Sequence, residues 1–329
     1  MPTNAHGQGY SDLNYLIPEL VRVIEYRKGP YFAEDGDFSS AGSAHIRYLD
    51  SLDGGLANLT VGGFGYRRLL LADSPRLFGA NDPQGNPSGP RLLGALELLE
   101  DKGPWTTPEG LAKANALLRL SDGGYASGWS VDGNFYQAHW TSTDQVPLAL
   151  IDSGQLGRFS ALDPTDGGNS GRAIVSGEWH RHDEAGYTNV SAYVEHYRLR
   201  LWSNFTFFEL RPATGDQFEQ EEHRNIYGGQ VVHGWRHALL GKESTTEVGL
   251  QVRHDDINVG LLNTEARIPF MTVSNDYVRE TEAGVVTRTK DVSPAAECFP
   301  WQHPALSPFV PNITSLAIAV KLEQSSNLK

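Results

Sequence analysis

The chain has 329 residues, which is long enough for one large domain or two ordinary ones. Its net charge of −13 comes from 40 acidic against 27 basic residues, and it argues against a nucleic-acid partner, which would need a basic surface. Hydrophobic residues make up 39% of the chain, without an uninterrupted apolar run of the ~18 residues that a transmembrane helix needs. The single cysteine, Cys298, excludes an internal disulfide framework and a cysteine-based zinc site.

The first predicted element is a strand that begins near Val21 and ends before Gly29 and Pro30. Proline has no backbone N–H and therefore cannot continue a strand ladder. A loop of small residues follows over 36–42, and a second short strand is predicted over 45–49. The sequence thus predicts two short strands joined by a small-residue loop.

From about Gly54 the sequence becomes a succession of short segments in which apolar and polar residues alternate, separated by Gly, Asp, Asn and Pro. The alternating apolar positions include Ala57, Leu59 and Val61; Ala114, Ala116, Leu118 and Leu120; Trp129, Val131 and Phe135; Ala173, Val175 and Trp179; and Val248, Leu250 and Val252. Such alternation predicts antiparallel strands with one apolar and one polar face. We expect about nine or ten strands of ~10 residues up to Val286.

Two features favour a membrane barrel over a soluble sandwich. Short connections, such as the one near Tyr187, alternate with long ones, such as the loop over 141–170, as in barrels of the outer membrane. Aromatic residues also gather where strands meet the long loops: Trp105, Phe135, Tyr136, Trp140, Trp202, Phe205, Phe207 and Phe208. Aromatic girdles of this kind are typical of the membrane interface.

The alternation stops near Val286. The stretch over 291–311 carries five prolines and shows no strand pattern. We therefore expect residues 287–329 to form a disordered tail unrelated to the barrel, which a shifted reading frame would produce.

The strands and loop near the amino terminus resemble the end of the plug domain of TonB-dependent outer-membrane receptors. In those receptors a strand ending in Arg-Gly-Pro leads into a small-residue turn and a final strand, and the chain then enters a large barrel. Lys28 stands here in place of that arginine. Further segments whose sequence is similar to these receptors lie at residues 6–14, 16–19, 144–147, 162–168, 204–206 and 215–218. The resemblance therefore spans most of residues 5–285.

The resemblance implies an all-β fold: an antiparallel transmembrane β-barrel of the plugged-receptor type, preceded by the end of the plug. Residues 1–50 would be the C-terminal part of the plug domain, and residues 51–286 the N-terminal part of the barrel. Because such transporters have about 22 strands, the barrel would be incomplete. The sequence Met1–Asn4 lacks the basic start and apolar core of a signal peptide. We therefore expect this chain to lack both the export signal and the TonB-coupling box.

The resemblance also implies energy-driven uptake of a scarce ligand, such as an iron–siderophore, cobalamin or an oligosaccharide. The expected partners are the TonB complex, a small-molecule ligand such as a metal chelate, and outer-membrane lipid. The full receptor would lie in the cell outer membrane, and we expect the incomplete chain not to transport by itself. Glu25, Arg27 and Lys28 are candidates for contacts between plug and barrel, and the alternative is that they are solvated strand charges.

Metal and catalytic sites have little support. His180 and His182 would share one face of a strand, but no third ligand is evident, so a solvated turn is favoured. Asp35 with Asp37 and the acidic segment 163–166 could bind calcium, but they are better interpreted as loops. Without a recognisable catalytic motif, we predict that the chain is not an enzyme and needs no cofactor or metal.

Two other classes of protein remain open. A soluble all-β carbohydrate-binding protein would bury its apolar strand face between two sheets, and a glycoside hydrolase would bring two carboxylates together in a cleft. A receptor would instead expose one continuous apolar band that includes Leu59, Val61, Val131, Val175, Leu250 and Val252.

Overall fold

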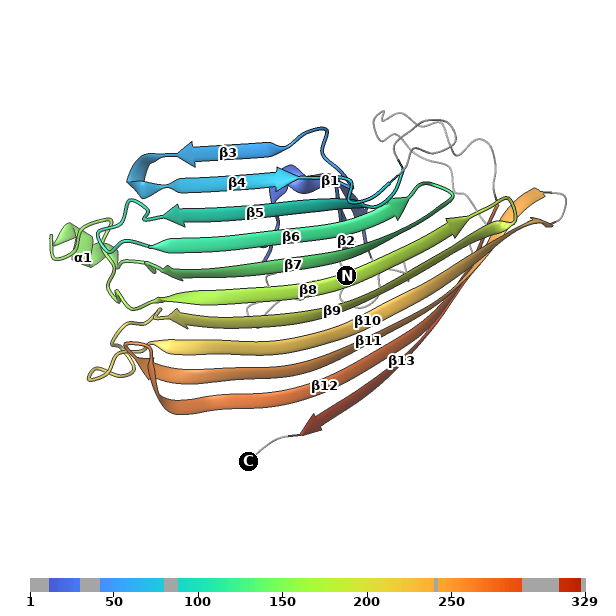
Figure 1. The fold of residues 1–329 in the computed structure, drawn as a ribbon. Coiled ribbons are helices and arrows are strands. Elements are labelled where there is room, and N and C mark those ends of the chain that lie inside the picture. Colours follow the sequence, from blue (N-terminus) through green and yellow to red (C-terminus); the bar gives the residue numbers. More distant parts are fainter. Residues whose placement is uncertain (1–11, 30–41, 80–87, 240–241, 292–313, 327–329) are drawn as a thin grey trace, which may run out of the picture.

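The computed structural model describes residues 12–29, 42–79, 88–239, 242–291 and 314–326. These residues form a two-stranded antiparallel sheet and an 11-stranded antiparallel sheet (Figure 1). The α-helix α1 (Leu148–Asp152) is a single short turn in a connection. Within the described ranges, no helix is long and apolar enough to cross a membrane.

The small sheet pairs β1 (Val21–Lys28) with β2 (Gly42–Tyr48). In the large sheet every strand is hydrogen-bonded to its neighbours in the chain, and the order is β3 (Leu56–Val61), β4 (Arg67–Asp73), β5 (Arg91–Asp101), β6 (Leu111–Gly123), β7 (Ser127–Thr141), β8 (Gly167–His182), β9 (Gly186–Ser203), β10 (Phe218–Leu239), β11 (Lys242–Glu265), β12 (Ile268–Asp291) and β13 (Thr314–Ser326). The sheet is open, with β3 and β13 at its edges. The predicted antiparallel all-β fold is confirmed, and β3–β12 correspond to the strands expected before Val286.

The strand β13 lies within the span 287–329 that was expected to be a disordered tail. It pairs with β12 from Thr289 opposite Thr314 to Tyr277 opposite Ser326. Its sequence does alternate, with Leu, Ile, Val and Leu at every second position over 316–322. The prolines that precede it interrupt the alternation of the earlier strands, so this later strand was not predicted.

The two ends of the large sheet differ in their connections. At the short-turn end, β6–β7 and β8–β9 are joined by residues 124–126 and 183–185. At the loop end, the connections over 102–110, 142–166 and 204–217 are longer. The alternation is imperfect, because β4 and β5 are joined at the short-turn end by residues 74–90.

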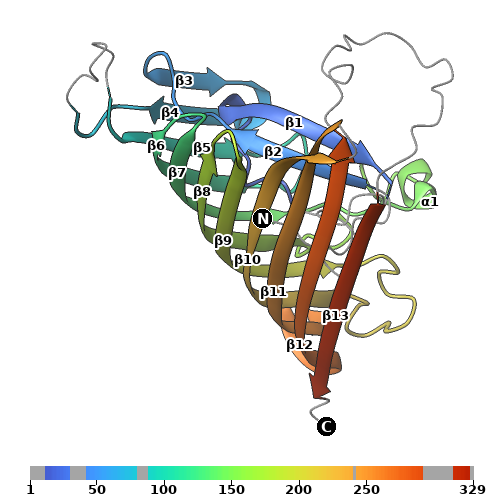
Figure 2. The ribbon, with the colours of Figure 1, turned by 90° about the vertical axis from the view of Figure 1, so that its right-hand side faces the viewer.

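We call the sheet face that contacts residues 12–20 the inner face and the opposite face the outer face. Ile17 and Leu20 are buried there in one cluster with Leu70, Leu93 and Leu117 of β4, β5 and β6. Figure 2 shows the large sheet curving round, with β1 and β2 lying across its open side.

The outer face carries a continuous apolar band. Its members are 40–73% exposed, and they are Leu59, Leu71, Leu96, Leu98, Leu118, Val131, Phe135, Val175, Val194, Val231, Leu250, Val252 and Val285. No second sheet covers this band in the described part of the chain. A soluble sandwich would bury these side chains, whereas a membrane barrel turns them towards lipid, so the band agrees with the receptor interpretation.

Candidate functional site

A line of ion pairs holds the N-terminal segment on the inner face. Glu19 accepts two hydrogen bonds from the Arg68 guanidinium of β4, at 2.6 and 2.8 Å. Arg68 also donates through Nε to Glu97 of β5 at 2.6 Å, and Lys113 Nζ of β6 lies 3.0 Å from the same carboxylate. Glu97 is fully buried, so these two cations compensate a charge that burial would otherwise penalise.

Further hydrogen bonds continue this line onto β6 and β8. The Asn115 amide donates to the backbone carbonyl of Asn14 at 3.0 Å. The Ser170 hydroxyl donates to the Asp12 carboxylate at 2.7 Å and lies 3.1 Å from the Tyr136 hydroxyl. The segment before β1 therefore contacts inner-face side chains of successive strands.

Arg172 of β8 is the most buried cation of the inner face. Its guanidinium carbon lies 4.5 Å from the centre of the Tyr15 ring and 5.0 Å from that of Tyr197. Its Nε lies 3.2 Å from the buried Glu195 carboxylate of β9. Two aromatic faces and one carboxylate thus surround the charge, and one of those faces belongs to the N-terminal segment.

The residue Asp50, which follows β2, supplies another contact with the large sheet. Its carboxylate lies 2.8 Å from Arg119 of β6, which also contacts Asp132 of β7 at 2.6 Å. Arg22 of β1 lies 3.5 Å from the other Asp50 oxygen. This contact therefore joins the small sheet to the large one.

The predicted contact residues Glu25, Arg27 and Lys28 all lie on β1. Glu25 lies 3.4 Å from Arg47 of β2, which is an ion pair within the small sheet, and Lys28 is exposed. Their role as contacts with the barrel stays a prediction. Asp12, Tyr15 and Glu19 were not predicted as contact residues, although all lie close to β1 in the sequence. The one signal for this segment was the family resemblance of residues 6–14 and 16–19.

His180 and His182 do lie side by side on β8, with ring centres 5.4 Å apart. His180 Nε2 donates to the Gly124 carbonyl at 2.8 Å, and His182 Nε2 lies 3.4 Å from the Asn189 amide oxygen. Among the residues that the structure describes, no group of three or more His, Cys, Asp or Glu is placed to hold a metal ion. Asp35 and Asp37 lie outside the described ranges.

At the loop end, the buried side chain of Gln217 joins three connections. Its Nε2 donates to the Thr165 hydroxyl at 2.8 Å and to the Asp166 carboxylate at 2.9 Å. Its Oε1 accepts from the Thr264 hydroxyl at 2.9 Å and from the Arg267 backbone at 2.8 Å. Every polar atom of this amide is therefore used, as burial requires.

Three carboxylates gather around the same point. The Asn204 amide donates to Asp163 at 2.9 Å, and the Asn204 backbone N–H donates to Asp144 at 3.1 Å. Burial, together with a hydrogen bond to Asp144, raises the pKa of Asp166 to about 8. Asp166 therefore carries a proton at neutral pH, which reduces the repulsion among the three groups.

A cavity of about 460 Å³ opens beside this cluster and shares Asp144 with it. Its lining comes from the β5–β6 and β7–β8 connections and consists of Trp105, Thr143, Asp144, Gln145, Val146, Ile151, Arg158 and Ser160. A flat aromatic ring, charges of both signs and neutral hydrogen-bonding groups can together hold a polar small molecule.

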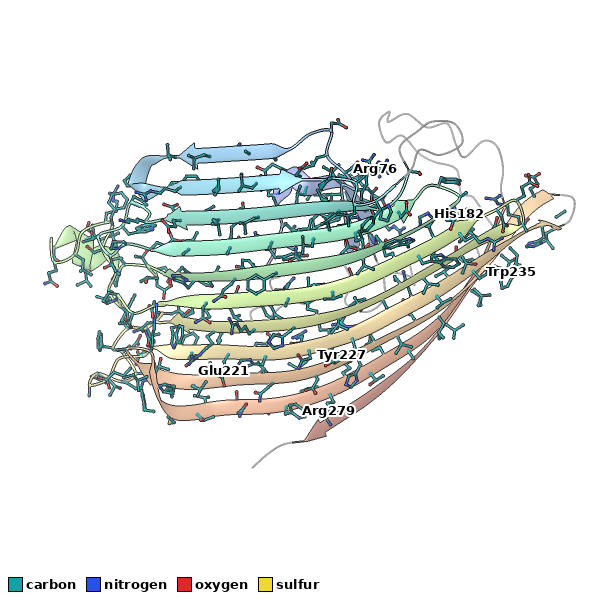
Figure 3. The ribbon with its side chains drawn as sticks, viewed as in Figure 1. Arg76, His182, Glu221, Tyr227, Trp235 and Arg279 are labelled. Carbon is teal, nitrogen blue, oxygen red and sulfur yellow. The ribbon has the colours of Figure 1, made fainter. Side chains whose placement is uncertain are left out.

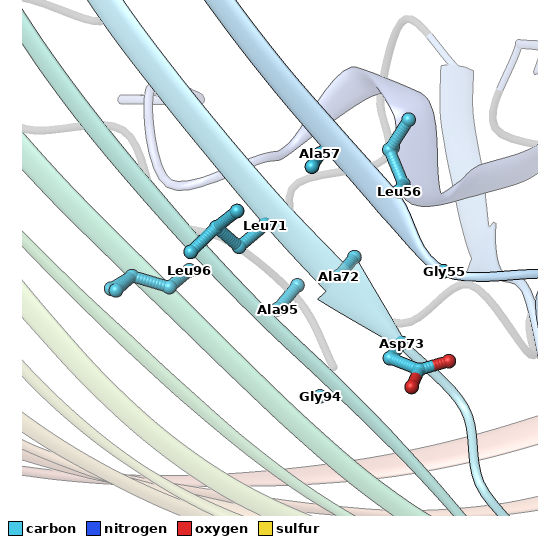
Figure 4. Close-up of a pocket in the computed structure, with 9 residues that line it drawn as sticks. All are labelled: Gly55, Leu56, Ala57, Leu71, Ala72, Asp73, Gly94, Ala95 and Leu96. Carbon is cyan, nitrogen blue, oxygen red and sulfur yellow. The ribbon is translucent and has the colours of Figure 1, made fainter.

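A second cavity, of about 500 Å³, lies at the opposite end of β3–β5 (Figure 4). It is lined by Gly55, Leu56, Ala57, Leu71, Ala72, Asp73, Gly94, Ala95 and Leu96. Its walls are aliphatic with one carboxylate, so they offer little to orient a polar ligand. The cavity at the loop end is the better candidate for a ligand site.

Comparison with known proteins gives matches among solved structures alone: neither a protein-family model nor a curated protein matches the chain. FpvA of P. aeruginosa, bound to heterologous pyoverdines, has 9% identity and a TM-score of 0.65 over 97% of this chain and 44% of that chain. The siderophore receptor PiuA from Acinetobacter baumannii has 9% identity and a TM-score of 0.62, over 92% and 51%. The ferric-catecholate import receptor Fiu from E. coli K12 has 10% identity and a TM-score of 0.57, over 91% and 56%.

This chain therefore spans about half the length of the receptors that it matches. At such low identity the likeness shows the fold, which is that of siderophore receptors, as the resemblance of the plug-like segment predicted.

Proposed function

We propose that this chain is part of a TonB-dependent outer-membrane receptor that takes up a scarce small-molecule ligand. One observation carries the proposal: a single sheet exposes an apolar band on its outer face and holds the N-terminal segment against its inner face through ion pairs and a small apolar cluster. In this proposal residues 1–50 are the end of the plug, residues 51–286 belong to the barrel wall, and the loop end faces outward.

The inner-face contacts suit a plug that must be held and then moved. When such a segment is displaced, water replaces the hydrogen bonds that Glu19 and Asp12 make with the sheet. Because carboxylates take part, each bond contributes about 1.5–3 kcal/mol net. A line of such bonds fixes the register of the segment, yet it can be broken stepwise by a force of the kind that TonB would supply. Glu25, Arg27 and Lys28 would add to these contacts in the full receptor.

The ligand class that we propose is a ferric chelate, bound first at the loop-end cavity. Trp105 offers a face for an aromatic or planar chelating group, and Arg158 offers a cation for its anionic oxygens. The names of PiuA and Fiu, a siderophore receptor and a ferric-catecholate import receptor, support this class. Cobalamin and oligosaccharides remain the alternative ligands.

We do not propose catalysis, and the matched solved structures are described as receptors. A glycoside hydrolase separates its two carboxyl groups by roughly 5–9 Å to admit the sugar. Among the residues that line the loop-end cavity, Asp144 is the single carboxylate, so the lining does not supply such a pair.

Two experiments test the proposal. Cells that express the full receptor are fractionated, and we expect this chain in the outer membrane; a soluble monomer would contradict the membrane assignment.

Purified receptor is then titrated with a ferric catecholate chelate while tryptophan fluorescence is recorded. We expect saturable quenching that Trp105→Ala abolishes and that Trp129→Ala, on the remote outer face, leaves unchanged.

A further inference from the structure

The β7–β8 and β9–β10 connections meet at the loop end of the large sheet, to the left of the labelled Glu221 in Figure 3. Asn204 joins them, because its amide donates to Asp163 at 2.9 Å and its backbone N–H donates to Asp144 at 3.1 Å. A further buried amide donates to both Asp163 and Asp166, at 3.3 and 2.9 Å. The three carboxylates therefore belong to one hydrogen-bonded group, which we call the loop-end acidic cluster.

The loop-end acidic cluster carries negative charge that the neighbouring arginines do not neutralise directly. Arg267 donates to two backbone carbonyls of the cluster, at 2.5 and 3.0 Å, rather than to a carboxylate. Arg200 and Arg211 form ion pairs with other acids. Within the described ranges, no arginine or lysine forms an ion pair with any of the three carboxylates. Removing carboxylates from water without such a partner is costly, so this arrangement favours a further positive charge.

Two acceptor oxygens of the cluster are buried without a hydrogen-bond partner. They are Oδ2 of Asp166 and Oδ1 of Asn204, and both residues are 1% exposed. Asp163 fixes the orientation of the Asn204 amide, because it accepts from Nδ2 and thereby leaves Oδ1 on the other side. Buried acceptors are almost always satisfied. A water molecule could donate to these oxygens, but it would not neutralise the charge, whereas a cation does both.

The atoms that are available to a cation are all oxygens. Carboxylate and amide oxygens are the ligands of hard cations such as Ca²⁺, whereas zinc and copper favour nitrogen or sulfur. Calcium also tolerates an irregular geometry and completes its coordination with water. Asp144 lines the loop-end cavity, so the cavity provides an entry path for the ion and room for its water ligands.

We propose that the loop-end acidic cluster binds one calcium ion through side-chain oxygens of Asp144, Asp166 and Asn204. Asp163 is a positioning residue that holds the Asn204 amide. This set has two acidic members and one amide, and it differs from a group of three acidic or histidine ligands, of which the described residues contain none placed to hold a metal. The inference goes beyond the proposed uptake function, and it differs from the sequence-based expectation that the chain needs no metal.

The ion has two consequences for the loop end. It removes the repulsion between Asp144 and Asp166, which a proton on Asp166 relieves only in part. It also ties the β7–β8 connection to the start of the β9–β10 connection at Asn204. Because only three side chains contribute ligands, we expect weak binding, with a Kd of about 10⁻⁴–10⁻³ M, as in extracellular calcium modules.

The test titrates calcium chloride into the full receptor in detergent at neutral pH, after treatment with a chelator and dialysis. The readouts are the heat of binding in isothermal titration calorimetry and the rate of proteolysis within 142–166. Magnesium chloride and sodium chloride at equal ionic strength are the comparison salts, because salt screens the repulsion within a chain of net charge −13. We expect one calcium ion per chain and slower proteolysis, which neither comparison salt should reproduce.

Two variants remove one carboxylate each without changing its shape. Asp144→Asn keeps an oxygen that can accept from the Asn204 backbone, and Asp166→Asn keeps one that can accept from the neighbouring amide. Each should bind calcium at least tenfold more weakly than the native protein. The matched control is Asp152→Asn, which removes an exposed carboxylate of the same connection and should bind calcium as the native protein does.

Three outcomes would overturn the inference: native protein that shows no saturable calcium binding, equal binding by both variants and the native protein, or an equal effect of sodium chloride. An equal effect of magnesium would overturn the assignment to calcium. Calcium binding in a receptor that takes up no ferric chelate would support the inference and contradict the proposed function alone.

Discussion

The guanidinium of Arg172 lies between the rings of Tyr15 and Tyr197, at 4.5 and 5.0 Å from their centres. This sandwich joins the segment before β1 to two strands of the large sheet. It is also buried, so water does not compete for the charge. Removing the cation and removing a polar group from one of the rings should therefore change the stability of the protein by different amounts.

We expect Arg172→Met to destabilise the protein by about 3–5 kcal/mol, because it leaves Glu195 buried without its partner. The control Tyr15→Phe keeps the ring over the guanidinium and should cost less than about 1 kcal/mol. Chemical unfolding in detergent measures both changes, and limited proteolysis reports whether the N-terminal segment is released. An Arg172→Met protein as stable as the control would contradict the importance of this contact.

Gln217→Ala should loosen the loop end. It leaves Asp166 and Thr264 with buried groups that have lost a partner, so we expect a loss of about 2–4 kcal/mol. Faster proteolysis within 142–166 and weaker chelate binding would accompany it. Gln145→Ala, an exposed amide of the same loop, is the matched control and should leave proteolysis unchanged.

Asp166 predicts an unusual dependence of stability on pH. Its pKa is about 8 in the folded protein, mainly because of burial, and 3.8 is the value expected when it is unfolded. Its favourable contribution is fully present below pH ~4 and is lost as pH rises through 8, because ionisation is easier in the unfolded chain. Thermal midpoints measured from pH 5 to 9 should fall in the native protein. The fall should be smaller in Asp166→Asn, and parallel curves would refute this assignment.

Glu19 should give the opposite dependence of stability on pH. The hydrogen bonds from Arg68 lower the pKa of its carboxyl below the usual value, so its contribution is present at neutral pH and is lost in acid. We expect release of the N-terminal segment, followed by proteolysis, as pH falls below 4.5, the ordinary pKa of a glutamate, and through the lowered pKa of Glu19. Glu19→Gln should already show this release at pH 7, and Glu25→Gln is the comparison on the exposed strand β1.

A charge on the outer face separates the membrane interpretation from a soluble one. Val131→Arg should destabilise a membrane-embedded sheet by about 2–4 kcal/mol, whereas Asn258→Arg, which lies nearer the loop end than the apolar band, should cost about 0–1 kcal/mol. Folding into lipid vesicles under denaturant titration measures both. If the protein were soluble, both substitutions would be surface changes of similar, small effect.

The sequence was sufficient for the parts of the fold that depend on local pattern. The alternation of apolar and polar residues around Leu250 and Val252 predicted an apolar outer face, because successive side chains of any strand point to opposite faces. The sequence was insufficient for contacts between residues that are distant in the chain. Tyr136 was expected in an aromatic girdle at the interface, but it is 2% exposed and clusters with Tyr15, because its strand position points inward.

The loop-end site was hidden for the same reason. Asp163 and Asp166 were interpreted as loop residues, which they are, but their contacts with Asn204 and Gln217 depend on how three connections meet. The segments 204–206 and 215–218, which resemble the family, contain Asn204 and Gln217, but the resemblance assigned no role to either amide. Neither composition nor spacing indicates which of many polar loop residues will be buried together.

The succession of neighbours in the large sheet also sets an order of assembly. Each strand after β3 can join by closing one hairpin with the strand made just before it, so the sheet can grow from local pairings. Asp12 and Tyr15, by contrast, find their partners on β8. Residues 12–20 precede every strand of the large sheet in the sequence, yet the contacts of Asp12 and Tyr15 can form only after β8 has joined the sheet.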